Sequence, residues 1–100
     1  MVSIGDLPDG VEFVRVTPTF DEHTVPPGLL AAHQVAAGVW GRLVVHSGAV
    51  RVVFEGAGER HDLTAGDTLA IPPETPHHLE LTGAVRLAVE FHRAQPRPPA

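Results

Sequence analysis

Short apolar runs separated by turn residues are the feature that most limits what this chain of 100 residues can fold into. The runs are four to seven residues long and rich in Val and Leu, which is typical of β-strands. Between them lie SG, EGAGE, TAGD, PPETP and TGA, whose Gly, Pro and Asp residues favour turns. This pattern predicts a β-sandwich or small β-barrel rather than alternating strands and helices. The expected strands are 11–16, 42–46, 49–54, 68–71, 77–81 and 85–91.

Two segments depart from this pattern. Residues 26–38, PPGLLAAHQVAAG, begin with Pro, continue with Ala and Leu and close with Gly, so their local propensity favours a short helix. Residues 94–100 are rich in Pro and lack apolar periodicity, which predicts an extended or disordered tail. A chain of this length makes one domain, which we place at 1–93.

Composition excludes several classes of function. There is no Cys, so disulfides and thiolate ligands are unavailable, and the seven His residues are the strong nitrogen ligands. A net charge of −5 and the absence of Lys argue against a nucleic-acid partner. No apolar run approaches the roughly 20 residues that cross a bilayer, and no export signal is visible, so we expect no membrane partner and a cytoplasmic location.

The stretch GDTLAIPPETPHH (66–78) presents a histidine on a stiffened backbone. Its prolines cannot continue a strand ladder, and they restrict the backbone that leads into His77. Period-two alternation in HHLEL then places His77 with Leu79 on the core face and His78 on the solvent face. A core-facing imidazole is either a buried group that hydrogen-bonds to the backbone or a pre-organised metal ligand or acid–base group.

The spacing of Gly66, Pro72 and His77 resembles the second motif of the cupin superfamily. VWGRLVVHSGAVRV (39–52) resembles the end of the first cupin motif. Over residues 7–93 the chain is similar to an uncharacterised cupin domain that is also found fused to the tellurite-resistance methyltransferase. The resemblance implies an all-β jelly-roll barrel of two antiparallel sheets, the cupin double-stranded β-helix, which typically forms a homodimer.

The resemblance also bears on the segment with helical propensity and on the metal site. It implies that 29–35 is a strand carrying His33, and that His33 and His77 face the same cavity. A standard cupin site takes two histidines and a glutamate from its first motif, but here the glutamate position falls at Gly41. A third ligand would therefore be another carboxylate, and Glu90 is the first candidate.

Glu90 has an alternative role. Alternation in VRLAVEF (85–91) puts Val89 and Phe91 on the apolar face and Glu90 on the opposite one. There it could form an ion pair with Arg86 or Arg42 instead of binding a metal. The predicted metal ligands are His33, His77 and Glu90, and the expected cofactor is a divalent zinc, iron, manganese or nickel ion.

Three functions follow from these observations. The leading hypothesis is a small cupin that binds a divalent metal or a small molecule in its barrel, in a context of tellurite or oxyanion stress that the resemblance implies. The second is a metal-dependent oxygenase or isomerase acting on a small molecule. The third is a metal-free, ligand-sensing module whose histidines are buried polar groups. Whether the chain is an enzyme stays open at this point.

Overall fold

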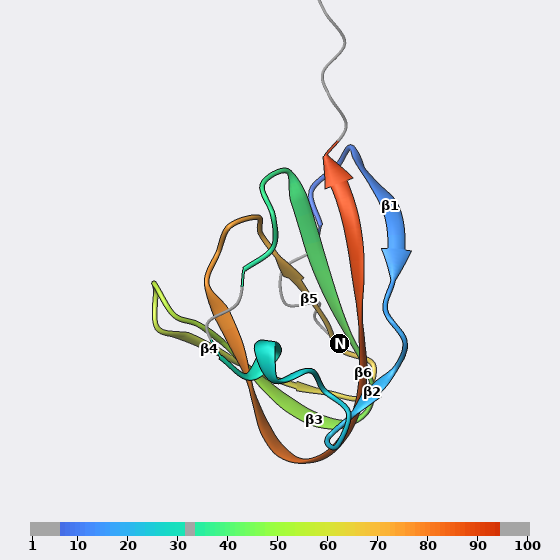
Figure 1. The fold of residues 1–100 in the computed structure, drawn as a ribbon, viewed down its shortest axis with the longest axis vertical. Coiled ribbons are helices and arrows are strands. Elements are labelled where there is room, and N and C mark those ends of the chain that lie inside the picture. The colour runs from blue at the N-terminus through green and yellow to red at the C-terminus, as the bar shows by residue number, and fades with distance from the viewer. Residues whose placement is uncertain (1–6, 32–33, 95–100) are drawn as a thin grey trace, which may run out of the picture.

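The computed structural model describes residues 7–31 and 34–94, and it is an all-β structure (Figure 1). No α-helix occurs in these two ranges, and a single 3-10 turn, η1, spans Pro27–Leu30. The all-β class predicted from the sequence is therefore confirmed. The strands are β1 (Val11–Val16), β2 (Phe20–Asp21), β3 (Val39–Phe54), β4 (Glu59–Thr64), β5 (Thr68–Ile71) and β6 (His77–Ala94).

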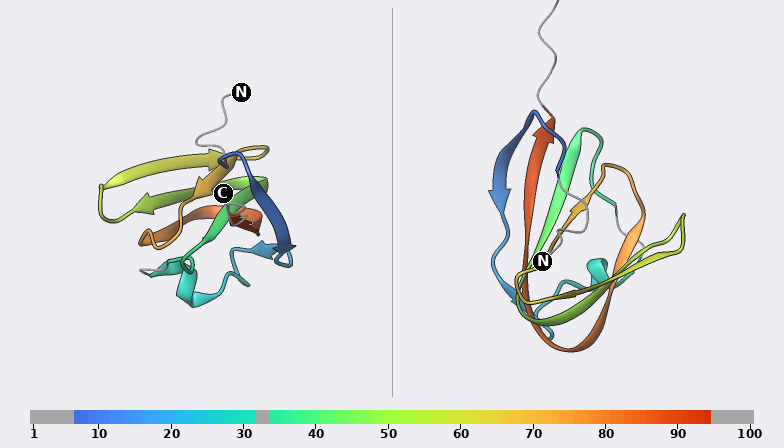
Figure 2. Two further views of the ribbon diagram at one scale, coloured as in Figure 1. Left: turned by 90° about the horizontal axis from the view of Figure 1, so that it is seen from above. Right: turned by 180° about the vertical axis from the view of Figure 1, so that it is seen from behind.

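Two long, bent strands form the frame of the barrel. β3 and β6 pair antiparallel along their whole length, from Val39 opposite Arg93 to Phe54 opposite His77. β5 pairs with the first half of β3 and β4 with its second half, while β1 and β2 pair with the second half of β6. Figures 1 and 2 show how β3 and β6 bend together, so that the paired strands wrap around a common interior.

The bend explains a difference from the sequence prediction. Residues 42–46 and 49–54 are parts of one strand, because Gly48 does not open a hairpin loop. It adopts φ +75° inside β3, where the register with β6 shifts on either side of it. Such a β-bulge interrupts the pairing locally and bends the strand, and pairing resumes on its other side. On the partner strand, TGA (82–84) lies opposite this bulge and within β6, so it does not form a hairpin loop either.

The segment after β2 also differs from what the resemblance implied. Residues 29–31, 34 and 35 contain no strand, and 27–30 form the 3-10 turn η1. Pro27 stands in the first turn of η1, where its fixed φ and missing N–H are tolerated. The strand expected at 29–35 is therefore wrong for the described part of that range, and the helical propensity is realised as one short turn. His33 lies outside the described residues.

The core lies between the two halves of the bent sheet. Leu43 and Val45 on β3 alternate inward with Val50 and Val52 after the bulge, and each is at most 1% exposed. Buried side chains of β4, β5 and β6 complete the cluster: Leu63, Leu69, Ile71, Leu79, Val85, Leu87 and Val89. The period-two pattern of these strands therefore supplies one continuous apolar interior.

Candidate functional site

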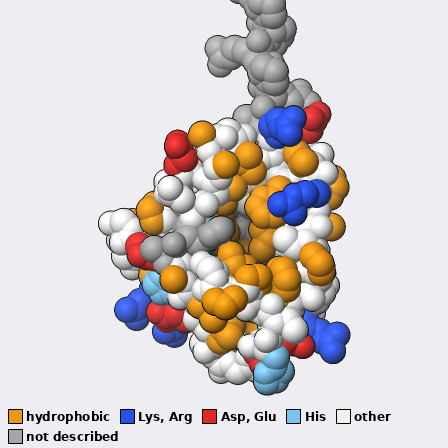
Figure 3. Space-filling model, in the orientation of Figure 1, with side chains coloured by type: hydrophobic (Ala, Val, Ile, Leu, Met, Phe, Trp, Pro, Cys, Tyr) orange, Lys and Arg blue, Asp and Glu red, His pale blue; other side chains and the backbone are white. Residues whose placement is uncertain are grey.

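An apolar cavity opens into the barrel between η1, β1 and the β3–β6 frame. Its volume is about 260 Å³, and Leu29, Leu43, Val89 and Phe91 are among the side chains that line it. Figure 3 shows apolar side chains gathered around a hollow on this face. Among the residues that the structure describes, the ionisable side chains of the lining are His77 and Arg15, and no Asp or Glu belongs to it. A concave, apolar site with few polar groups has the composition of a small-molecule pocket.

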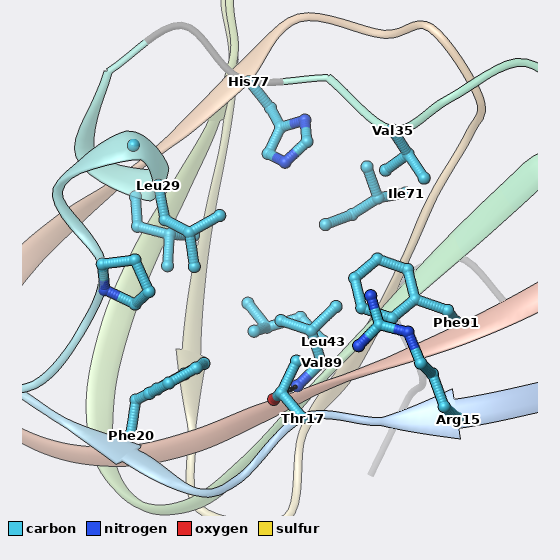
Figure 4. A pocket seen from close by; sticks show the side chains of 13 residues that line it. Arg15, Thr17, Phe20, Leu29, Val35, Leu43, Ile71, His77, Val89 and Phe91 are labelled. Carbon is cyan, nitrogen blue, oxygen red and sulfur yellow. Dashed lines mark hydrogen bonds between the residues drawn. The ribbon is translucent and has the colours of Figure 1, made fainter.

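His77 is buried at the start of β6, as the alternation predicted, with 3% of its surface exposed. Its Nδ1 lies 2.8 Å from the carbonyl oxygen of Thr75. A carbonyl oxygen can only accept a hydrogen bond, so Nδ1 carries a proton, and Nε2 is the acceptor nitrogen whenever the ring is neutral. Figure 4 shows the ring directed from β6 into the cavity. His77 therefore directs its imidazole into the cavity in a fixed orientation.

The backbone before His77 accounts for that orientation. Pro72, Pro73 and Pro76 restrict the connection from β5 to β6, and Glu74 turns it at φ +56°. Two backbone hydrogen bonds fasten the connection: Glu74 N–H donates to the Val35 carbonyl at 2.8 Å, and Glu55 N–H donates to the Pro76 carbonyl at 3.0 Å. The imidazole is thus placed by rigid backbone rather than by its own side-chain contacts alone.

Arg15 stands at another side of the same cavity (Figure 4). It lies opposite Phe91 in the β1–β6 register, and its guanidinium carbon is 4.4 Å from the centre of the Phe91 ring. This is a cation–π contact that holds the side chain against the cavity wall. Arg15 is nevertheless exposed, so it lies at the rim of the cavity. Nothing in VEFVRV indicates its contact with Phe91, because this contact depends on pairing with a strand that is distant in the sequence.

Glu90 lies on the other face of β6, away from the cavity lining. Both of its carboxylate oxygens accept hydrogen bonds from Arg42 Nη1 at 3.1 Å, and His92 Nε2 lies 3.0 Å from Oε1. Burial raises the pKa of Glu90, but the hydrogen bonds from His92 and Arg42 outweigh this effect, so the net pKa is lowered. Glu90 is therefore an ionised member of an ion pair with Arg42, one of the alternatives considered from the sequence.

The three predicted metal ligands are thus placed differently. His77 lines the cavity, Glu90 faces the opposite side of the sheet, and His33 belongs to the undescribed residues. Within 7–31 and 34–94 no group of three or more His, Asp or Glu side chains is arranged to hold a metal ion. The described residues therefore bring together one imidazole and one guanidinium, not a set of metal ligands.

His78, the neighbour of His77, belongs to a charged cluster on the outer face. Its Nδ1 lies 3.0 Å from Glu55 Oε2, and its Nε2 lies 3.1 Å from Glu80 Oε2. Because carboxylates only accept, both ring nitrogens donate when the ring is protonated. The hydrogen bonds to Glu55 and then Glu80 raise the pKa of His78 above its ordinary value of 6.5.

This cluster predicts a pH-dependent contribution to stability. A raised folded-state pKa makes the imidazolium stabilising at pH below about 6.5, and this stabilisation is lost as pH rises through the folded-state pKa. Glu80, whose pKa the His78 hydrogen bond lowers, stays ionised over that range. We expect His78→Gln to lose more stability near pH 6 than near pH 9, as measured by urea denaturation. Exposed His46→Gln is the control, and an equal loss in His78→Gln at both pH values would refute the assignment.

The bent β3–β6 frame, the surrounding strands and the internal cavity define a cupin-type β-barrel. The chain belongs to the TehB-like domain family, whose model matches residues 15–89. The resemblance to a cupin domain associated with tellurite-resistance proteins is thereby confirmed at the level of family and fold.

Solved structures share this fold. The crystal structure of a protein from E. coli strain K12, determined by a structural genomics consortium, has a TM-score of 0.80 and 26% identity, and the match covers 91% of this chain and 98% of that one. TehB from Haemophilus influenzae has a TM-score of 0.75 and 18% identity over 86% of this chain and 32% of its own. This chain therefore spans about a third of TehB.

A more distant structure also shares the fold. HppE, in its iron(II) form in complex with substrate, has a TM-score of 0.56 and 21% identity over 87% of this chain and 55% of its own. This likeness extends to the fold alone. A comparison with curated protein sequences gave no match. In the described ranges, no helix is long and apolar enough to cross a membrane.

Proposed function

We propose that this domain binds a small organic molecule in its barrel cavity, with the apolar body of the ligand against the lining and a polar group at His77. The observation that carries this proposal is an apolar cavity into which one imidazole of fixed tautomer is directed. Binding would remove apolar surface of both partners from water, which is the main favourable contribution. The imidazole would fix the orientation of the ligand through a hydrogen bond to Nε2.

The cavity volume limits the size of the ligand. About 260 Å³ lies just below the range of roughly 300–1,000 Å³ that is usual for drug-sized ligands. The site therefore suits a metabolite-sized molecule, such as one with a single six-membered ring and a short chain. Phe20 and Phe91 in the lining offer aromatic faces for such a ring.

A titration with 3-phenylpropanol tests this proposal, because this probe has one ring, a short chain and a hydroxyl that can donate to His77. We expect the backbone amide resonances of Leu43, His77 and Val89 to move on binding. In Leu29→Trp, the larger side chain would occupy the cavity and weaken binding at least about tenfold, or roughly 1.4 kcal/mol.

The matched control uses the next residue of η1. Leu30 is 41% exposed and does not belong to the lining, so Leu30→Trp should bind the probe as the unaltered protein does. Unchanged affinity in Leu29→Trp, or resonance shifts confined to residues outside the lining, would refute the proposal.

A divalent metal at His77 is the alternative that the sequence predicted. One feature supports it: a metal-ligating histidine commonly donates its other ring N–H to a carbonyl, as His77 does to Thr75. The described residues nevertheless supply one ligand, and Glu90 is engaged by Arg42 on the other face, so they do not by themselves fit a metal. We therefore derive no metal-dependent oxygenase or isomerase step. If the purified protein holds near-stoichiometric metal and His77→Ala loses it, the ligand at His77 is a metal rather than an organic molecule.

The stress context implied by the resemblance to the tellurite-resistance methyltransferase's domain forms part of the proposal. Membership of the TehB-like family supports it. The apolar lining suits an organic molecule better than a hydrated inorganic oxyanion, so such a role would act through an organic ligand. A deletion strain as tolerant of tellurite as its parent would count against this context.

A further inference from the structure

We propose that the ligand of the barrel cavity is a carboxylate, and that Arg15 binds its carboxylate group. This inference rests on the proposed function and specifies the class of ligand. It follows from the place of Arg15 in the lining and from the charges around it.

The first observation is that Arg15 is held against an aromatic ring, and that no acid of residues 7–31 and 34–94 pairs with it. Its guanidinium lies over Phe91, whereas Arg42 is paired with Glu90 and Arg51 with Asp62. Arg15 forms no ion pair with an Asp or Glu in the described parts of the chain. Stacking uses the face of the guanidinium and leaves the N–H groups at its edge able to donate.

The second observation is the charge of the cavity. Among residues 7–31 and 34–94, the lining contains Arg15 and His77 but no carboxylate, so this part of the chain places no negative group there that would repel an anion or compete for the guanidinium. The nearby Thr17 hydroxyl is already engaged, because it accepts from Val89 N–H at 3.0 Å and donates to the Pro18 carbonyl at 2.9 Å. Arg15 is therefore the group of the lining best suited to bind an anion.

The chemistry of Arg15 and of the apolar lining determines which kind of anion the cavity would bind. A guanidinium matches the two oxygens of a carboxylate with two parallel N–H donors. The rest of the cavity is apolar, which favours an anion attached to a hydrocarbon or aromatic body. An inorganic oxyanion lacks such a body and would lose hydration without compensating contacts. The structure thus favours small aromatic or aliphatic carboxylates that also carry a hydrogen-bond donor, such as a hydroxyl, for His77.

The test compares 3-phenylpropionate with 3-phenylpropanamide, which have the same shape and differ in charge. Calorimetric titration of the unaltered protein should show at least about fivefold tighter binding of the carboxylate. Arg15→Gln should bind both probes equally. Arg86→Gln, which changes the net charge by the same amount at an exposed site outside the lining, should keep the preference. Thermal unfolding checks that both variants are folded.

The outcomes separate this inference from the proposed function. If the unaltered protein binds the amide as tightly as the carboxylate, the assignment of Arg15 is wrong and the organic-ligand proposal stands. Competition by sulfate at the concentration effective for 3-phenylpropionate would show a general anion site and would also overturn the inference. If neither probe nor 3-phenylpropanol binds, both proposals fail.

Discussion

Replacing Gly48 with alanine is expected to lower the free energy of unfolding by about 3 kcal/mol or more. Gly48 adopts φ +75° at the bulge of β3, where a side chain is strained. A Cβ atom built there would lie 2.0 Å from the carbonyl oxygen of Ala84 and 2.8 Å from the Cα of Val85. Both are backbone atoms of β6, so relief requires the two long strands to separate at their bend.

Gly58→Ala is the matched control for this effect. Gly58 has a similar φ of +70° in the β3–β4 turn, but nothing lies within 4 Å of a Cβ built there. It should cost only the backbone strain, about 1–2 kcal/mol. Urea denaturation of both variants separates the cost of backbone strain from the cost of the steric clash with β6. Equal losses in Gly48→Ala and Gly58→Ala would show that β3 and β6 do not approach as closely as the structure indicates.

Leu87→Ala is expected to cost about 2–5 kcal/mol of unfolding free energy. Leu87 is completely buried on β6, opposite Val45 of β3 and Phe20 of β2. Truncation would leave a cavity where these three strands meet, and the backbone pairing of β6 with β3 and β2 would limit its collapse.

The control for Leu87→Ala is Leu30→Ala on η1. Leu30 is 41% exposed, so the same truncation should cost less than about 1 kcal/mol. Chemical denaturation under one set of conditions measures both variants. A loss below about 1 kcal/mol for Leu87→Ala would contradict its place at the centre of the core.

Local patterns in the sequence predicted some strands fully and others only in part. Strands 11–16 and 68–71 have the predicted limits, because clear turn residues flank them. The two long strands were each divided in the prediction, because SG and TGA resemble turns but here form a bulge and a bend. β4 was not predicted, since ERHDLT has one buried apolar residue, Leu63, and therefore little hydrophobic signal.

The candidate site, like the strands, could be predicted from the sequence only in part. His77 follows from local information, because prolines and period-two alternation determine where its side chain points. For Glu90, alternation correctly indicated the face opposite Val89 and Phe91, and the structure identifies Arg42 as its partner. Arg15 could not be found, because its contact with Phe91 depends on pairing between residues far apart in the chain.

The most direct test of ligand binding at His77 is nitrogen-15 NMR of its imidazole ring during titration with 3-phenylpropanol. Binding in the cavity should move the Nε2 resonance, while Nδ1 keeps the shift of a protonated nitrogen bonded to the Thr75 carbonyl. Leu29→Trp should abolish the movement at Nε2. If the probe binds and the Nε2 resonance stays where it was, His77 does not hold the ligand, and the proposed function would be contradicted.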